Sequence, residues 1–320
     1  LMQPAKTYLQ IVGGFCILNA LIPICSSYLR AFGFSKEPLY ASIIGNVINF
    51  CLNAFFLFVL HKGVAGVATA TVISRIINLV IVVLLGAVLV KAKQHPERES
   101  NRAVMGQIIR IGLPSACETA IYNVSMTLVI RFLNQMDAQG LNVTARSYTM
   151  QITNFSYCVG AALAQANAIM TGWHIGAKEY DACDRGTKKA AVIGVIVAVI
   201  LETVFTLCSG WIMQLFSKDP QMVSLVGKLL AIDIVLEMGR VTNLVYGQAL
   251  KTSGDAVFPV VMGACFMILC SVGGTYLFGI RLGLLAVGAY IGMTGDECVR
   301  AVGMYLRWKS GKWKNKGLVD

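Results

Sequence analysis

Long runs of apolar residues, each about the length of a membrane-spanning helix, alternate with short polar breaks along the whole chain. A helix that crosses the hydrocarbon core of a bilayer needs about 20 mostly apolar residues. Nine runs meet this requirement, and we expect each of them to form one transmembrane helix. They cover residues 7–29, 38–61, 65–90, 105–133, 146–171, 187–215, 223–250, 257–280 and 283–306.

Two of the polar breaks resemble each other, which indicates an internal repeat. The stretch LRAFGFSKEP at 29–38 and the stretch LKTSGDAVFP at 250–259 lie 221 positions apart. Each follows one long apolar run and precedes two more. The matched pairs are Leu29/Leu250, Arg30/Lys251, Gly33/Gly254 and Pro38/Pro259. The alternative is a chance likeness between two loops that both use glycine and proline.

The repeat pairs the first three spans with the last three and leaves spans four to six without a partner. We therefore expect an all-α fold, a polytopic membrane helix bundle with nine spans here of twelve in two pseudo-symmetric six-helix bundles. Because the chain starts at Leu1 and opens directly into a span, we expect an N-terminal truncation of three spans. The predicted parts are the remainder of the N-terminal bundle at 1–92, a cytoplasmic linker at 93–103, the C-terminal six-helix bundle at 104–308 and a cytoplasmic tail at 309–320.

The composition supports a membrane protein. Of the 320 residues, 56% are hydrophobic and 13% are charged, which is about half the charged share of a soluble globular protein. The formal net charge of +11 does not indicate a nucleic-acid partner, because the basic residues do not cluster with aromatic residues on one face. The expected surroundings are a lipid bilayer, in which we expect the protein to be a monomer.

Lysine and arginine in the short loops predict the orientation of the chain. Cytoplasmic loops carry an excess of these residues. One set of alternating breaks collects most of them, whereas the other set has few. The basic set lies at 30–36, 91–102, 178–189, 251 and 307–316. We therefore expect a multi-pass protein of the plasma (inner) membrane whose C-terminus is cytoplasmic.

The cysteines and histidines do not indicate a metal site or an enzyme. None of the ten cysteines forms a CxxC pair, and most lie inside apolar runs, where cysteine behaves as a small hydrophobic residue. His61, His95 and His174 are far apart and lack ligand spacing. The chain has no P-loop, no HExxH and no paired catalytic His and Cys. We expect no cofactor, no metal and no enzymatic activity.

The segment DIVLEMGRVTN carries four polar residues inside an apolar run: Asp233, Glu237, Arg240 and Asn243. A charged residue at the centre of a membrane helix costs at least about 2.5–3.5 kcal/mol on insertion scales. Spacings of four, three and three place the residues on one helix face, which must point into the protein or a water-filled cavity. The stripe is either a cation site at which Glu237 exchanges a proton, or a structural Glu237–Arg240 pair that joins two helices.

Glu118 in span four lies in a different setting. Gly112 and Pro114 are expected to break or bend the start of this helix, and proline removes one backbone donor. A glutamate one turn beyond the proline can lie beside freed backbone carbonyls, which suits a cation. The alternative is an acidic residue in the first helical turn, near the cytoplasmic face, where the helix dipole stabilises it.

Four further residues are secondary candidates. Glu202 is alone in the middle of span six, and its role stays open. Asp296 and Glu297 precede Arg300 by four and three residues near the cytoplasmic end of span nine. Pairing is easy at that spacing, so we favour a structural role for these three residues.

Five stretches, taken in chain order, resemble the MATE (multidrug and toxic compound extrusion) transporters. YLRAFGFSKEPLYASIIGNVINFCLNAFFLF and KGVAGVATATVISRIIN look like the fourth to sixth spans of that family. IGLPSACE resembles the start of the seventh span, GWHIGAKEYDAC the loop after the eighth, and ALKTSGDAVFP the loop after the tenth. The resemblance implies a fold of two bundles that form a V, with export of drugs or metabolites driven by inward H⁺ or Na⁺.

The resemblance carries over to helix faces and not to single residues. In the family, the acidic residue of the seventh span falls about one helical turn later than Glu118, counted from the proline. The acidic position of the tenth span falls nearer Arg240 than Glu237. We still expect Glu118 and Glu237 to contact the cation or the substrate. Asp233 and Arg240 are expected to be neighbours that set the pKa of Glu237.

The predicted function is a secondary active antiporter that exports small cationic organic molecules, drugs or metabolites by alternating access, with H⁺ or Na⁺ as the coupling ion. A first alternative is a lipid-linked oligosaccharide flippase of the same superfamily, which needs a lumen richer in arginine and lysine. A membrane-embedded transferase needs longer polar loops than these. The last alternative is a non-transporting truncated remnant.

Overall fold

The computed structural model describes residues 2–91, 101–137 and 140–316, and these residues form helices with no β-strand among them. The all-α fold class is therefore confirmed. The chain divides into two compact units, Leu1–Arg98 and Glu99–Asp320. The boundary falls within the predicted linker at 93–103, of which residues 93–100 lie outside the described part.

The first unit consists of α1 (Met2–Gly14), α2 (Leu18–Ala31), α3 (Lys36–Ala54), the π-helical η1 (Phe55–Val59) and α4 (Gly63–Lys91). Helix α4 packs against the other three α-helices. The buried apolar core of this unit is small, because much of its apolar surface faces outward. One cluster of buried residues contains Leu29, Ala41, Val82 and Val90.

The span expected at 7–29 is bent, so that two helices take the place of one straight helix. Helices α1 and α2 are separated at Phe15–Ile17, and their axes differ by 42°. Gly13 and Gly14 come directly before the break, and glycine has a low helix propensity. The amides of Phe15 and Cys16 bond to carbonyls three residues back, as in a tight turn, instead of four.

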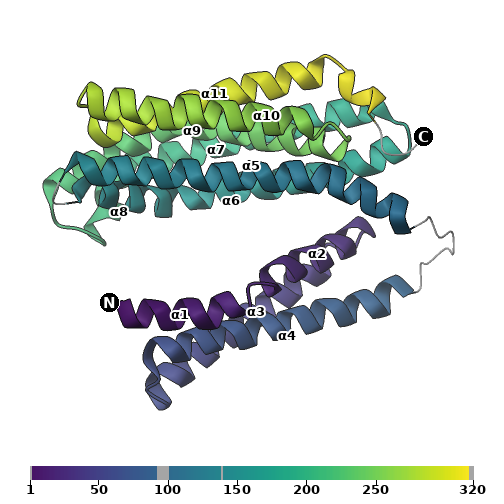
Figure 1. The fold of residues 1–320 in the computed structure, drawn as a ribbon, viewed down its shortest axis with the longest axis horizontal. Coiled ribbons are helices and arrows are strands. Elements are labelled where there is room, and N and C mark those ends of the chain that lie inside the picture. Colours follow the sequence, from purple (N-terminus) through teal and green to yellow (C-terminus); the bar gives the residue numbers. More distant parts are fainter. Residues whose placement is uncertain (1, 92–100, 138–139, 317–320) are drawn as a thin grey trace. The chain divides into compact units, whose positions relative to one another are not determined.

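The second unit is a bundle of long helices (Figure 1). Helix α9 is its central element, since it packs against α6, α7 and α11. The predicted span at 187–215 ends early, at Leu207, and the short α8 follows. The elements are α5 (Asn101–Met136), α6 (Leu141–Gly176), α7 (Tyr180–Leu207), α8 (Ser209–Gln214), α9 (Pro220–Thr252), α10 (Val257–Phe266), the π-helical η2 (Met267–Val272) and η3 (Thr275–Arg281), α11 (Leu285–Lys309) and the 3₁₀-helix η4 (Lys312–Asn315).

Local signals set the start of α9. Asp219 is the N-cap residue, and its side chain accepts a hydrogen bond from the amide of Gln221 at 2.9 Å. Pro220 follows at the first helical position, where its missing N–H costs nothing. These signals fix where the helix begins, and the residues within it bury surface on several sides, as a central helix must.

The two loops of the predicted repeat end their helices with the same turn. Gly33 after α2 has φ of +89°, and Gly254 after α9 has φ of +88°. In both turns the next amide bonds back across the glycine, from Phe34 to the Leu29 carbonyl at 3.0 Å and from Asp255 to the Leu250 carbonyl at 2.9 Å. This is the left-handed helix ending that glycine favours. The sequence match therefore reflects a shared backbone conformation.

The same offset also relates the π-helical turns of the two units. Shifted by 221 positions, residues 55–59 of η1 become 276–280, which lie within η3. A π-turn places one extra residue in a helix and changes the direction of the residues after it. The repeat thus extends from the turn into the helix that follows it.

Four helical segments of the described chain are long and apolar enough to cross a membrane: Lys36–Val59, Gly63–Val90, Tyr180–Leu207 and Val257–Arg281. The bent pair α1 and α2 adds a fifth if it is counted as one span. Helices α5, α6, α9 and α11 are also long, but they carry the charged and polar side chains described below. The count of nine spans stays a prediction.

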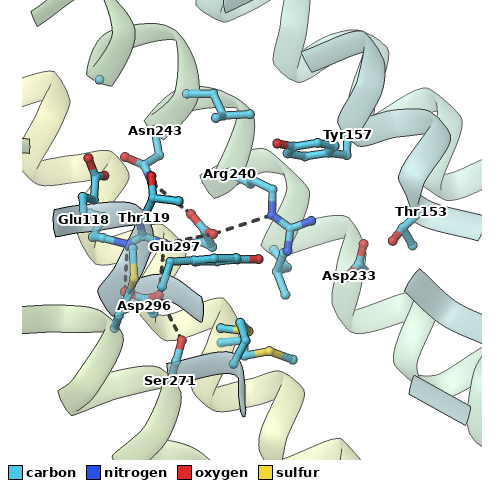
Figure 2. A pocket seen from close by; sticks show the side chains of 18 of the residues that line it. Glu118, Thr119, Thr153, Tyr157, Asp233, Arg240, Asn243, Ser271, Asp296 and Glu297 are labelled. Carbon is cyan, nitrogen blue, oxygen red and sulfur yellow. Dashed lines mark hydrogen bonds and ion pairs between the residues drawn. The ribbon is translucent and has the colours of Figure 1, made fainter. Parts of the chain in front are cut away.

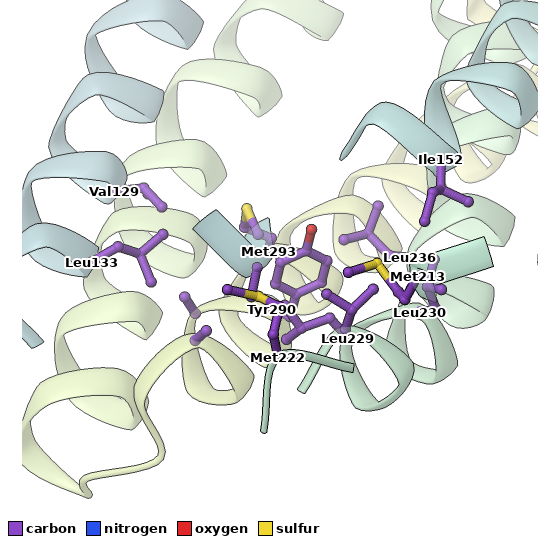
Figure 3. Close-up of a cluster of buried hydrophobic side chains, with 14 residues drawn as sticks. Val129, Leu133, Ile152, Met213, Met222, Leu229, Leu230, Leu236, Tyr290 and Met293 are labelled. Atoms are coloured by element: carbon purple, nitrogen blue, oxygen red, sulfur yellow. The ribbon is translucent and has the colours of Figure 1, made fainter. Parts of the chain in front are cut away.

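Two apolar cores lie at opposite ends of the second unit. The first core joins the early half of α9 and of α11 to α5, α6 and α8 (Figure 3), and Leu230, Met213 and Tyr290 are among its buried residues. The second core gathers around the late half of α9 and of α11, with Val245 and Trp308. The polar residues of α9 and α11 therefore lie between two apolar layers.

The C-terminal residues up to Lys316 fold back onto the bundle. Trp313 is 2% exposed and stacks on Trp308, with 4.1 Å between the ring centroids. Asp255, in the turn after α9, is fully buried and accepts hydrogen bonds from Arg307 Nε at 2.6 Å and Lys316 Nζ at 2.7 Å. This carboxylate ties the end of the chain to the end of α9.

We expect Asp255→Asn to lower the free energy of unfolding by about 2 kcal/mol at neutral pH, because Arg307 and Lys316 lose their charged acceptor. Burial raises the pKa of Asp255, but the hydrogen bonds and charges of Arg307 and Lys316 lower it more, so that its pKa lies below the ordinary value of 3.8. The carboxylate therefore stabilises the fold above the unfolded-state pKa, and this stability is lost as the pH falls through the folded-state pKa.

Thermal unfolding in detergent measures this effect, with Asp181→Asn as the control because Asp181 is exposed at the start of α7. The difference between wild type and Asp255→Asn should be full at neutral pH and should shrink as the pH falls below the ordinary aspartate pKa of 3.8. A difference that does not depend on pH would contradict a role for the charge.

Candidate functional site

A cavity of about 460 Å³ lies within the second unit, between α5, α6, α9, α11 and the segment of α10 and η2. Its volume is in the range of small-molecule sites. The lining combines charged groups with methionine and tyrosine side chains. The charged residues are Glu118, Arg146, Asp233, Arg240, Lys251, Asp296, Glu297 and Arg300.

The polar stripe of α9 faces the interior, as its spacing predicts. Asp233, Arg240 and Asn243 line the cavity. Glu237 is fully buried behind them, with no exposed surface. The stripe therefore points into the protein or into the cavity within the described chain.

Arg240 joins α9 to α11. Its guanidinium donates a short hydrogen bond to Glu237 Oε1, one turn back on α9, and its Nε lies 3.6 Å from Glu297 Oε1 on α11. Asn243 donates to the other oxygen of Glu297 at 3.0 Å. The second Glu237 oxygen, Oε2, is buried without a hydrogen-bond partner among the described residues. The structural pair considered for this stripe is therefore present.

Arg300 makes a second ion-pair group on α11. Its Nε donates to Asp296 at 2.8 Å, and its Nη2 lies 2.9 Å from Glu297. Ser271 of η2 also donates to Asp296 at 2.9 Å (Figure 2). The expected pairing is confirmed, but the expected place near the helix end is wrong. Asp296 is buried near the middle of α11 and lines the cavity.

Gly239 allows the two charged groups to meet. A Cβ atom at this position would lie 2.9 Å from the carbonyl carbon of Glu297 and 3.0 Å from the amide nitrogen of Cys298. Those distances are too short for a side chain, so only glycine permits this separation of α9 and α11. The close contact holds Arg240 within reach of Glu297.

Glu118 lines the same cavity from α5, but it has a cationic partner. Lys251, at the end of α9, donates to its Oε2 at 2.6 Å. Helix α5 continues through Pro114 instead of starting or ending there. The setting of backbone carbonyls expected around Glu118 is therefore replaced by an ion pair between α5 and α9.

Asp233 is the exception among the cavity carboxylates. It is 2% exposed and makes no hydrogen bond or ion pair with any described residue, and its Oδ2 is buried without a partner. In Figure 2 it lies on the other side of Arg240 from Glu297 and Asp296. A buried carboxylate without a protein partner is costly unless it is protonated or binds a cation.

Glu202 lies outside the cavity, on α7. It has no exposed surface, and neither carboxylate oxygen has a hydrogen-bond partner among the described residues. The charges of Asp233, Glu237 and Arg240 on α9 act on it. The structure thus joins Glu202 electrostatically to the stripe on α9. No group of three His, Cys, Asp or Glu side chains in the searched part of the chain is arranged to hold a metal ion.

Sequence reasoning missed Arg146 and Lys251 as site residues. Position 251 was counted only among the orienting loop charges, and Arg146 was only the first residue of the predicted span at 146–171. A signal for Arg146 is nevertheless present in α6, because buried polar residues recur there at spacings of three and four. They are Asn142, Arg146, Thr149, Thr153 and Ser156. This is the same periodicity that identified the stripe on α9.

The MatE family model matches residues 114–277, about half of the chain. The chain is 34% identical over 325 residues to the uncharacterized transporter YisQ of Bacillus subtilis (strain 168), a match that covers 100% of this chain and 71% of that protein. It is 22% identical to the probable multidrug resistance protein NorM of Thermotoga maritima, over 98% of this chain and 68% of that one.

Solved structures share the fold. A crystal structure of MATE in the straight conformation has a TM-score of 0.84 at 18% sequence identity, and the match covers 97% of this chain and 70% of that one. A structure of MATE in the bent conformation has a TM-score of 0.79 at 19% identity, with the same coverage. These likenesses concern the arrangement of the helices.

Proposed function

Because this chain belongs to the MATE family of membrane transporters, we propose that it is a secondary active antiporter that exports organic cations, drugs or metabolites in exchange for H⁺ or Na⁺. The chain is a transporter by family, and the substrate, the coupling ion and the direction are our proposal. We also propose that the protein is a monomer in the plasma (inner) membrane, and the loop charges described above support a cytoplasmic C-terminus.

The unpaired carboxylate of Asp233 is the observation that supports this proposal most directly. Three carboxylates that line the cavity have cationic partners, namely Glu118, Glu297 and Asp296. Asp233 has none among the described residues. An unpaired carboxylate in a cavity of drug-like volume attracts a cation strongly, because the surroundings screen charge poorly. The geometry therefore favours Asp233 over Glu118 and Glu237 as the group that binds the cation.

The exchange follows from competition at one carboxylate. Asp233 holds either the organic cation or the coupling ion, and the two exclude each other because a single negative charge is available. When a proton or Na⁺ enters from outside, the substrate loses its counter-charge and leaves; when the coupling ion departs on the inner side, the site is ready again. Arg240, fixed between Glu237 and Glu297, holds the wall of the cavity in place.

The flippase alternative receives less support from the cavity. A lipid-linked oligosaccharide carries phosphate, which favours a lumen with free basic groups. Four cationic side chains line this cavity in the described chain, and three of them, Arg240, Arg300 and Lys251, are already bound to carboxylates. Only Arg146 is left for a phosphate, and the unpaired carboxylate of Asp233 in the same cavity would repel that phosphate.

Purified protein in lipid vesicles tests the proposal. Ethidium, a permanent cation, is the probe, and its movement is measured with a pH gradient alone, with a Na⁺ gradient alone and with neither. We expect movement against the ethidium gradient only while one of the ion gradients is present, and the effective gradient identifies the coupling ion. Equal movement in all three conditions rules out antiport, and no movement in any of them rules out the cationic substrate.

A further inference from the structure

Arg146 on α6 is a buried cation that no described residue balances. It is 7% exposed and lines the cavity. Its Nε has no hydrogen-bond partner, and Nη2 reaches only the sulfur of Met126 at 3.7 Å, which is a weak acceptor. A guanidinium stays charged at physiological pH and offers five donors. Burying it without an anion is costly.

The other cationic side chains of the cavity provide the contrast. Arg240, Arg300 and Lys251 each hold at least one carboxylate at ion-pair distance. Arg240 and Lys251 tie helices together in this way, and Arg300 is held by its own helix, α11. Arg146 forms no ion pair within the described chain, so a structural ion pair does not explain why a charged residue is buried at this position.

Tyr290 lines the same cavity as Arg146 and Asp233. Arg146 and Asp233 form no ion pair with each other, since Asp233 Oδ2 and Arg146 Nε are both buried without a partner among the described residues. The tyrosine is 2% exposed and belongs to both the apolar core and the cavity wall (Figure 3). The cavity therefore has a free negative charge and a free positive charge that do not neutralise each other.

We propose that Arg146 binds an anionic group of the transported molecule, so that this cavity prefers zwitterions that carry a carboxylate or a similar anion in addition to the cationic group. The cationic group goes to Asp233 and the carboxylate to Arg146, whose planar fork matches a carboxylate with two parallel hydrogen bonds. This inference rests on the proposed function, because it names the class of molecule that the same cavity carries.

A pair of dyes tests this preference, since rhodamine 110 is a zwitterion and rhodamine 123, its methyl ester, is a cation of nearly the same shape. Fluorescence anisotropy measures the binding of each dye to the purified protein in detergent. We expect wild type to bind the zwitterion about tenfold more tightly than the ester, as a charge-assisted hydrogen-bond pair allows. Arg146→Met should remove this difference by weakening the zwitterion only, and Arg146→Lys should keep part of it.

Thermal unfolding of the same samples separates binding from structure. Because Arg146 has no partner to lose, Arg146→Met should unfold at or above the wild-type temperature. Equal weakening of both dyes by Arg146→Met, or no effect on either, would overturn the proposal, as would a wild type that binds neither dye. Detergent binding needs no ion gradient, so a failure of antiport leaves this measurement unaffected.

Discussion

Replacing Asp233 by asparagine is expected to reduce gradient-driven ethidium transport at least tenfold. The amide has nearly the size of the carboxylate but no charge, so the cavity loses its one unpaired anion among the described residues. An ion pair at about 4 Å contributes a few kcal/mol at an effective dielectric constant of about 20, and about 1.4 kcal/mol already equals a factor of ten in affinity. Asp233 forms no salt bridge that the substitution could break, so the variant should fold.

Two further variants make the result specific. Asp181→Asn removes an exposed acidic residue at the start of α7 and should transport ethidium at the wild-type rate. Glu237→Gln removes a carboxylate that is already bound to Arg240, and its loss of transport should be smaller than that of Asp233→Asn. The reverse order, with Asp233→Asn near wild type and Glu237→Gln inactive, would return the cation-binding role to Glu237.

Replacing Arg240 by methionine is expected to lower the free energy of unfolding by about 3 kcal/mol or more. The fully buried Glu237 would lose its partner, and breaking one side of a buried pair typically costs about 3–5 kcal/mol. Methionine keeps much of the side-chain volume, so the loss reports on charge more than on packing. Thermal and denaturant-induced unfolding in detergent measure the change.

The double variant Glu237→Met with Arg240→Met identifies the cause. Removing both charges should restore most of the lost stability, because two apolar side chains can replace a buried ion pair at little cost. If the stability lost in the double variant equals the sum of the losses in the two single variants, the two residues do not interact. If the double variant also transports ethidium, the pair is a structural tie; if it is stable but inactive, Glu237 takes part in the exchange.

Much of this architecture follows from patterns that a sequence displays directly. Runs of apolar residues predict helices, and the turns at Gly33 and Gly254 have nearly the same φ, as their matched positions in the repeat indicate. The spacing of Asp233, Glu237, Arg240 and Asn243 indicated one shared face, and the structure buries that face. These features are local, because they depend on residues within one helix or one turn.

The break at Phe15–Ile17 shows where such patterns stop being sufficient. An apolar run of suitable length predicts a single helix, and hydropathy does not register a change of direction within the run. Two adjacent glycines weakened the helix there, yet glycines at many other positions of this chain lie within unbroken helices. Whether a glycine bends a helix depends on what packs around it.

The sequence alone thus determined that this protein is a helical membrane bundle with an inward-facing charged stripe on α9, since periodicity states which face a residue occupies. Only the tertiary structure decided which of those charges are satisfied. The partner of Glu118 lies 133 positions away at Lys251, and the partner of Asn243 lies 54 positions away at Glu297. Pairing across helices depends on how the helices approach, as at Gly239, and spacing within one helix carries no information about it. For that reason Asp233 and Arg146, the two charged residues of the cavity without an ion-pair partner among the described residues, became recognisable only once the bundle was assembled.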